Sequence, residues 1–138
     1  MKDRLRILCV DDEDTCQLLT LLLGISSIEV KSAQTIAAAW HLAQTEAFDL
    51  YLLETKLSDG NGFDLCRRLR EYAPHTPILI FSSAAFENDK KNGLAAGAND
   101  YLTKPYLGNL AETIRESIEQ IKNPVLQIKT ISVQHRQN

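Results

Sequence analysis

Short apolar runs alternate with amphipathic helical patterns along this chain, and this alternation constrains its fold more than any other feature. The apolar runs cover residues 6–10, 28–33, 48–54, 76–82 and 99–103, and each precedes a helical pattern. Strand and helix units in such a succession predict a parallel sheet with helices on both faces. The runs RILCV, LYLL and ILIF are nearly continuous in apolar residues, so we expect both sides of these strands to be covered.

The helical patterns follow the apolar runs at residues 14–24, 35–44, 62–72, 84–97 and 107–122. In the last pattern, Ile114, Ile118 and Ile121 recur at the spacing of one helix face. Gly24 and Gly97 are expected to end the first and fourth helices. The fourth pattern contains two asparagines and an internal glycine, which have poor helix propensity, so we expect that helix to be short or mobile.

The charge balance argues against a nucleic-acid or membrane partner. The chain has 15 Lys and Arg against 18 Asp and Glu, a net charge of −3, which is not the basic excess that phosphate backbones and anionic lipids attract. The start of the chain has too short an apolar run for a signal sequence, and no apolar stretch approaches the roughly 20 residues of a membrane span. We therefore expect a cytoplasmic protein with no direct nucleic-acid or membrane contact.

The cysteines are expected to be core residues in a reducing setting. Cys9, Cys16 and Cys66 show no Cys-x-x-Cys spacing and have no partner histidine cluster. Cys9 and Cys66 fall in apolar patterns, where cysteine behaves as a small hydrophobic residue.

Acidic residues follow two of the predicted strands. In a doubly wound sheet the ligand site lies outside the carboxyl ends of the strands, so Asp11, Asp12 and Glu54 should share one pocket with Ser82 and Lys104. Clustered carboxylates repel one another, and such a cluster typically binds a hard cation, with Mg²⁺ suiting one or two carboxylates plus carbonyls and waters. The alternative is that these acids cap a helix, an interpretation we prefer for Glu13 and Asp14.

These motifs resemble the receiver domain of two-component response regulators. The resemblance is carried by VDDE (10–13), DLYLLETKLSDGNGFDLCRRLR (49–70), PILIFSSA (77–84), AAGANDYLTKP (95–105) and the final amphipathic helix. It spans residues 4–122 and leaves 123–138 as a tail, linker or added strand. The resemblance implies a flavodoxin-like (βα)5 fold of strand order 2-1-3-4-5, which accepts a phosphoryl group from a histidine kinase on an aspartate after the third strand.

The resemblance also implies a role for each site residue. Asp11, Asp12 and the backbone carbonyl of Lys56 would hold Mg²⁺. Ser82 and Lys104 would contact the phosphoryl group, Tyr101 would be the aromatic switch, Pro105 would follow a cis bond, and Gly62 would be the glycine of the loop after the third strand.

The departure from the family pattern is Glu54, which stands where the family has its acceptor aspartate. Its extra methylene carries the carboxylate about 1.5 Å farther from the backbone, whereas productive sites tolerate roughly 0.5 Å. We therefore expect poor phosphotransfer and weakened Mg²⁺ binding. Glu54 could instead imitate the phosphorylated state by reaching toward Ser82 and Lys104, although its charge of about −1 is smaller than that of a phosphate. A deliberate Asp-to-Glu substitution is a third interpretation.

The sequence thus predicts a non-enzymatic receiver-type signalling module whose output is protein–protein contact. The expected partners are a histidine kinase or phosphotransfer protein, a downstream protein, and a second copy through the face formed by the fourth helix, fifth strand and fifth helix, within residues 101–119. The alternatives are a phosphorylation-competent receiver and a Mg²⁺-dependent phosphohydrolase, although no insertion is long enough to form a substrate cap. Flavin binding is disfavoured because the carboxylates after the first strand would repel its phosphate.

Overall fold

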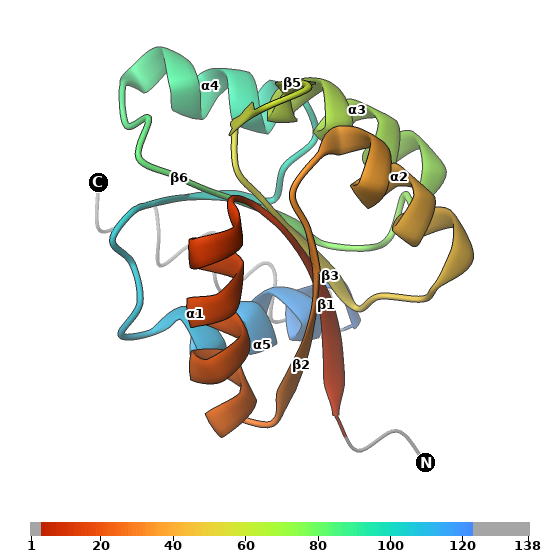
Figure 1. Cartoon of the computed structure of the whole chain (residues 1–138). Helices are drawn as coiled ribbons and strands as arrows, with labels where there is room; N and C mark the ends of the chain where they lie inside the picture. The colour runs from red at the N-terminus through yellow and green to blue at the C-terminus, as the bar shows by residue number, and fades with distance from the viewer. Residues whose placement is uncertain (1–3, 123–138) are drawn as a thin grey trace.

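The computed structural model describes residues 4–122, which form a five-stranded parallel sheet in the order β2-β1-β3-β6-β7 (Figure 1). The strands are β1 (Leu5–Val10), β2 (Ile28–Ala33), β3 (Leu50–Leu53), β6 (Ile78–Ser82) and β7 (Asp100–Thr103). All four pairings are parallel. The predicted order 2-1-3-4-5 and the flavodoxin-like fold are confirmed, with β6 and β7 as the fourth and fifth strands of the sheet.

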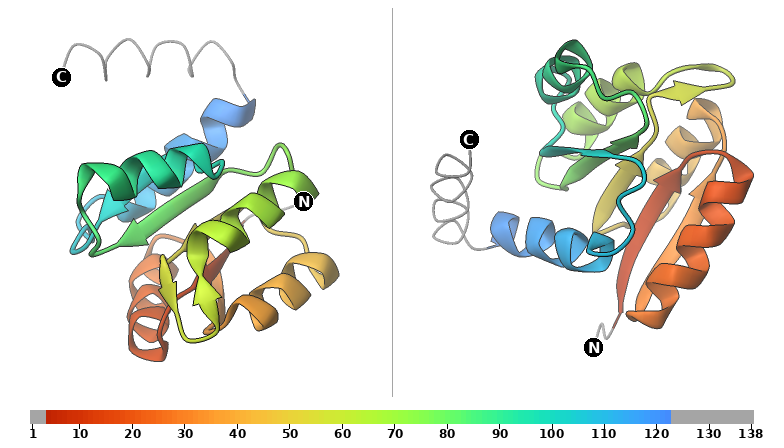
Figure 2. Two further views of the ribbon diagram at one scale, coloured as in Figure 1. Left: turned by 90° about the horizontal axis from the view of Figure 1, so that it is seen from above. Right: turned by 90° about the vertical axis from the view of Figure 1, so that its left-hand side faces the viewer.

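Helices cover both faces of this sheet. They are α1 (Glu13–Ile25), α2 (Ile36–Thr45), α3 (Gly62–Tyr72), α4 (Glu87–Ala95) and α5 (Leu110–Lys122). Helices α1 and α5 lie on one side, and α2, α3 and α4 lie on the other (Figures 1 and 2). Each layer encloses its own apolar cluster, and the side chains of β3 are buried on both faces. The expectation of doubly covered strands is therefore correct.

The sequence patterns located the helices better than they located the helix ends. Helix α1 continues past Gly24 to Ile25, so the prediction that this glycine ends the helix is wrong. The turn that follows uses Ser27, which has a positive φ of 63°. Gly97 does follow α4 and has a φ of 112°, the conformation that favours glycine. Helix α4 has nine residues and is short, as expected.

A small hairpin, which the sequence patterns did not indicate, follows the third strand. Strands β4 (Lys56–Leu57) and β5 (Gly60–Asn61) pair antiparallel. The Asp59 carboxylate in its turn accepts hydrogen bonds from the N–H groups of Ile36 and Ala37, at 2.8 and 3.1 Å. The hairpin is thereby attached to the N-terminus of α2, which fixes the loop after β3.

All three cysteines are buried, which confirms the core prediction. The predicted tail at residues 123–138 lies outside the described residues. Among residues 4–122, no helix combines the length and apolar character that crossing a membrane requires.

Candidate functional site

Three charged residues stand one position beyond the strands, at the carboxyl edge of the sheet. Asp11 follows β1, Glu54 follows β3 and Lys104 follows β7. Their backbone N–H groups donate to the last carbonyls of β2, β1 and β6, at 3.1, 2.8 and 2.9 Å. The sheet ladder therefore extends by one hydrogen bond at each point, and this extension holds the three side chains over the same edge.

The Lys104 ammonium joins the two carboxylates. Its Nζ lies 2.9 Å from Asp11 Oδ2 and 3.0 Å from Glu54 Oε1. The Asp11 side chain is almost completely buried, and those of Glu54 and Lys104 are 12% and 21% exposed. The sequence prediction that these three residues converge is correct.

Both oxygens of the Glu54 carboxylate are engaged. Oε1 accepts from Lys104, and Oε2 accepts from the backbone N–H of Thr55 at 2.5 Å and from the Thr55 hydroxyl at 3.2 Å. The longer side chain therefore does not extend freely into the pocket. It folds back onto the residue that follows it.

Burial and hydrogen bonding set the ionisation of these groups. Burial raises the pKa of Glu54, but hydrogen bonds from Ser82, Lys104 and Thr55 outweigh that effect, so its pKa lies below the usual value. For Asp11 burial prevails, and the pKa is raised despite the bonds from Lys104 and the Asp12 N–H. Burial lowers the pKa of Lys104, but its bonds to Asp11 and Glu54 outweigh that effect and raise it. The site thus favours an ionised Glu54 paired with a charged lysine.

Asp12 has a different position from Asp11. Its Oδ1 accepts from the Thr15 N–H at 2.7 Å, which makes it the N-cap of α1, and this bond lowers its pKa. Glu13 and Asp14 lie in the first turn of α1, which confirms the prediction that they are acidic residues of the helix N-terminus, whereas the capping role of Asp12 itself is one that the sequence prediction disfavoured. Asp12 makes no direct bond to Lys104, so its place in a cation site stays a prediction.

Carboxylate oxygens, which Mg²⁺ accepts as ligands, gather at this edge of the sheet. Two carboxylate oxygens, from Asp11 and Glu54, already converge on one positive charge, the Lys104 ammonium. Within residues 4–122, no three acidic, cysteine or histidine side chains come close enough to hold a metal among themselves. Mg²⁺ does not require such a cage, because it usually keeps several waters and takes one or two carboxylates. The carbonyl of Lys56, in β4, stays a predicted ligand.

Gly62 allows α3 to begin directly behind Glu54. A Cβ at this position would lie 2.0 Å from the Glu54 carbonyl oxygen and 2.9 Å from Thr55 Cα. The Gly62 N–H donates to the Thr55 carbonyl at 2.8 Å. The glycine predicted for this loop is therefore required by a close backbone approach, which also fixes the orientation of the Glu54 backbone.

A chain of hydrogen bonds leads from Glu54 to Tyr101. The Thr55 hydroxyl lies 3.0 Å from the Ser82 hydroxyl, and Ser82 Oγ accepts from the Ala84 N–H at 3.1 Å. The Tyr101 hydroxyl donates to the Ala84 carbonyl at 2.5 Å. Sequence reasoning named Ser82 and Tyr101 but missed Thr55, because one threonine after a strand carries no pattern of its own.

Two further features complete the surroundings of the site. The Lys104–Pro105 peptide bond is cis, as the resemblance implied.

A pocket of about 340 Å³ opens beside Glu54, between the hairpin and the loop that precedes α4, and Ser82 and Phe86 also line it. A small ligand can therefore approach the Glu54 carboxylate from solvent.

The fold and this edge define a flavodoxin-like α/β domain with an acidic pocket paired to a lysine. The profile of the response regulator receiver domain family matches residues 7–119. The chain therefore belongs to the response regulator receiver domain family of two-component signalling proteins.

Individual relatives agree with this assignment. The chain is 36% identical over 123 residues to the response regulator protein PilR of Pseudomonas aeruginosa, over 88% of this chain and 27% of PilR. A response regulator receiver domain protein (CheY-like) from Methanospirillum hungatei superposes with a TM-score of 0.82 at 27% identity, over 88% and 99% of the two chains. A BeF3-activated DrrB receiver domain superposes with a TM-score of 0.76 at 27% identity, over 84% and 98%. The chain spans about a quarter to three-fifths of the length of the curated relatives it matches.

Proposed function

We propose that this receiver-type module carries Glu54 at the phosphoryl-acceptor position, that phosphotransfer to Glu54 is impaired, and that the output is protein–protein contact. One observation carries the proposal: both oxygens of the Glu54 carboxylate are already held, by Lys104 on one side and Thr55 on the other. A nucleophile needs a free oxygen lone pair directed at phosphorus. Oε1 accepts one hydrogen bond and keeps a second lone pair, so the contacts with Lys104 and Thr55 restrict the orientation of the carboxylate and do not use up its lone pairs.

The position of the Glu54 carboxylate should lower the rate of phosphotransfer further. Phosphoryl transfer depends almost entirely on in-line placement and on charge neutralisation, so a misplaced carboxylate loses rate steeply. The additional methylene of Glu moves the carboxylate about 1.5 Å farther from the backbone, whereas a productive site tolerates a displacement of roughly 0.5 Å. Gly62 and the ladder bond to β1 fix the backbone of Glu54, so the backbone cannot withdraw to compensate.

Asp11, Asp12 and the Lys56 carbonyl are the proposed Mg²⁺ ligands. When bound, the ion would neutralise charge that develops on a phosphoryl group at this edge. Asp11 and Lys104 are held by their mutual ion pair, and Asp12 is oriented by its bond to the Thr15 N–H. The raised pKa of Asp11 reflects the cost of burying its charge, and a divalent cation would offset part of that cost.

The proposed output face consists of α4, β7 and α5. Tyr101 in β7 connects this face to the site, since its hydroxyl is bonded to the loop that receives the hydrogen-bond chain from Glu54. Phe86 and Leu94, at the start and near the end of α4, are 82% and 54% exposed. Large exposed apolar side chains of this kind favour a contact with another protein, such as a downstream partner or a second copy. A histidine kinase or phosphotransfer protein is the proposed partner on the input side.

Beryllofluoride with Mg²⁺ tests the acceptor proposal, since it forms a tetrahedral phosphoryl-like group on a carboxylate oxygen. Beryllofluoride is titrated at a constant, saturating Mg²⁺ concentration, and the amide chemical shifts of Thr55, Ser82 and Lys104 are followed by NMR. We expect no saturable shift for the unmodified chain and a saturable shift for Glu54→Asp. Glu54→Gln, which lacks a carboxylate, is the matched control. Saturable shifts in the unmodified chain that disappear in Glu54→Gln would contradict the proposal.

A further inference from the structure

Two of the three cysteines face each other beneath the loop that carries Asp11 and Asp12. Cys9 lies in β1, Cys16 lies in the first part of α1, and their Sγ atoms are 3.7 Å apart. The Cys16 thiol also lies 3.7 Å from the carbonyl oxygens of Cys9 and Asp11. The two sulfurs are therefore in van der Waals contact, with no side chain between them.

We propose that Cys9 and Cys16 are a redox modification site, at which a small uncharged disulfide converts the two thiols into a reversible intramolecular disulfide bond. Bond formation would bring the two sulfurs from 3.7 Å to the roughly 2.05 Å of an S–S bond. Both residues belong to well-formed elements, so their relative placement is set by the fold and not by a flexible loop.

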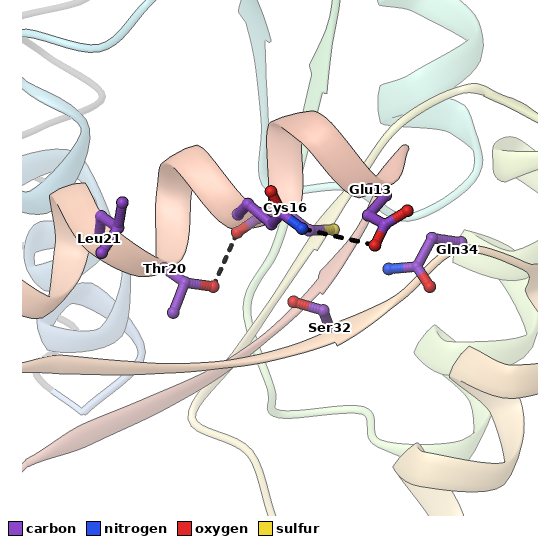
Figure 3. Close-up of a pocket in the computed structure, with 7 residues that line it drawn as sticks. Glu13, Cys16, Thr20, Leu21, Ser32 and Gln34 are labelled. Atoms are coloured by element: carbon purple, nitrogen blue, oxygen red, sulfur yellow. Dashed lines mark hydrogen bonds between the residues drawn. The ribbon is translucent and has the colours of Figure 1, made fainter.

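The two thiols differ in whether they border a surface pocket. Cys16 lines a surface pocket of about 480 Å³ together with Thr20, Ser32 and Gln34, as Figure 3 shows. Cys9 is not among the residues that line this pocket. Glu13 also lines the pocket, and its carboxylate disfavours an anionic reagent. Cys16 is only 2% exposed, but it is the thiol of the pair that borders this pocket, so a small neutral disulfide would meet Cys16 first.

The exchange proceeds in two balanced steps. The Cys16 thiolate attacks one sulfur of the reagent, forms a mixed disulfide and expels the first reagent thiolate. The Cys9 thiolate then attacks Cys16 Sγ, forms the Cys9–Cys16 bond and expels the second thiolate. The protein loses two electrons and two protons, and the reagent disulfide is reduced to two thiols. A dithiol reductant reverses the sequence.

Closing this bond would enclose the acidic loop in a short ring. The ring runs from residue 9 to residue 16 and contains both Asp11 and Asp12, and it replaces the present contact of the Cys16 thiol with the Asp11 carbonyl. The disulfide bond would therefore lie next to the charged edge of the sheet. This proposal does not depend on whether Glu54 accepts a phosphoryl group.

The test treats the folded full chain with bis(2-hydroxyethyl) disulfide, then unfolds it and alkylates the free thiols. Trypsin releases residues 7–31, which contain both Cys9 and Cys16, and residues 57–67, which contain Cys66. We expect peptide 7–31 to be unalkylated and lighter by two hydrogens, and peptide 57–67 to be alkylated. Dithiothreitol should restore two alkylation sites to peptide 7–31.

Variants and a folding measurement complete the test. Cys66→Ala should still form the bond, whereas Cys9→Ala should accumulate a mixed disulfide on Cys16. The circular dichroism of the oxidised chain should match that of the reduced chain. Full alkylation of peptide 7–31, a mixed disulfide that persists in the unmodified chain, or a bond that forms only in urea would each overturn the proposal.

Discussion

Thr55 shows how one side chain can connect a site to its surroundings. It is 6% exposed, its hydroxyl lies 3.2 Å from the Glu54 carboxylate and 3.0 Å from the Ser82 hydroxyl, and its N–H holds the same carboxylate. The Ser82 hydroxyl also bonds to the Glu54 carboxylate directly. The Thr55 hydroxyl should therefore carry part of the coupling between the acidic edge and the loop before α4.

Replacing that hydroxyl tests its contribution. Thr55→Val keeps the shape of the side chain but removes both hydroxyl contacts, so we expect the free energy of unfolding to fall by about 1 kcal/mol. Urea denaturation of the two chains measures the difference. Thr20→Val is the matched control, because the Thr20 hydroxyl bonds only to a carbonyl in its own helix, and it should have a smaller effect. An unchanged stability for Thr55→Val would show that the hydroxyl contributes nothing.

The ionised state of Glu54 should appear in the pH dependence of stability. Its pKa is lower in the folded chain than in the unfolded chain, so its charge stabilises the fold above the unfolded pKa of about 4.3. This contribution is lost as the pH falls through the lower folded value. The stability difference between the unmodified chain and Glu54→Gln should therefore be largest near neutral pH and shrink below about pH 4. Urea midpoints across the acid range measure it, and a difference that grows on acidification would contradict the assigned shift.

At the scale of elements, the start of α3 determines where the acidic residue stands. Gly62→Ala would place a Cβ 2.0 Å from a backbone oxygen, which no side-chain movement can relieve. We expect a loss of at least about 2 kcal/mol in the free energy of unfolding. Gly24→Ala is the matched control, because it meets nothing within 4 Å inside α1 and should stabilise the chain by about 0.5 kcal/mol. Thermal denaturation of the two variants compares them, and equal melting temperatures would rule out the close approach.

The strands and helices were predictable because each carries a repeated pattern, and so was the convergence of Asp11, Glu54 and Lys104. A parallel sheet brings the carboxyl ends of its strands to one edge, so strand ends alone indicate which residues meet. The β4–β5 hairpin could not be found this way, because strands of two residues are too short to show alternation. The bonds of Thr55 were equally invisible, since they depend on side-chain orientation and not on spacing.

At the scale of the whole molecule, the site and the face formed by α4, β7 and α5 are linked through side-chain and backbone contacts. Asp11, Glu54 and Lys104 lie at one end of the hydrogen-bond chain, and Tyr101 lies at the other. Under the proposed function, the ionised glutamate holds the loop before α4 without any modification. That proposal implies a signalling domain whose conformation depends on its sequence more than on a phosphoryl donor.

Intact-mass spectrometry after incubation with acetyl phosphate and Mg²⁺ tests this role of Glu54 most directly. We expect no phosphoryl adduct on the unmodified chain and a clear adduct on Glu54→Asp, whose side chain has the length of the family's acceptor aspartate. Glu54→Gln should remain unlabelled in the same experiment. A robust adduct on the unmodified chain that is absent from Glu54→Gln would show that Glu54 accepts phosphoryl groups and would contradict the central claim.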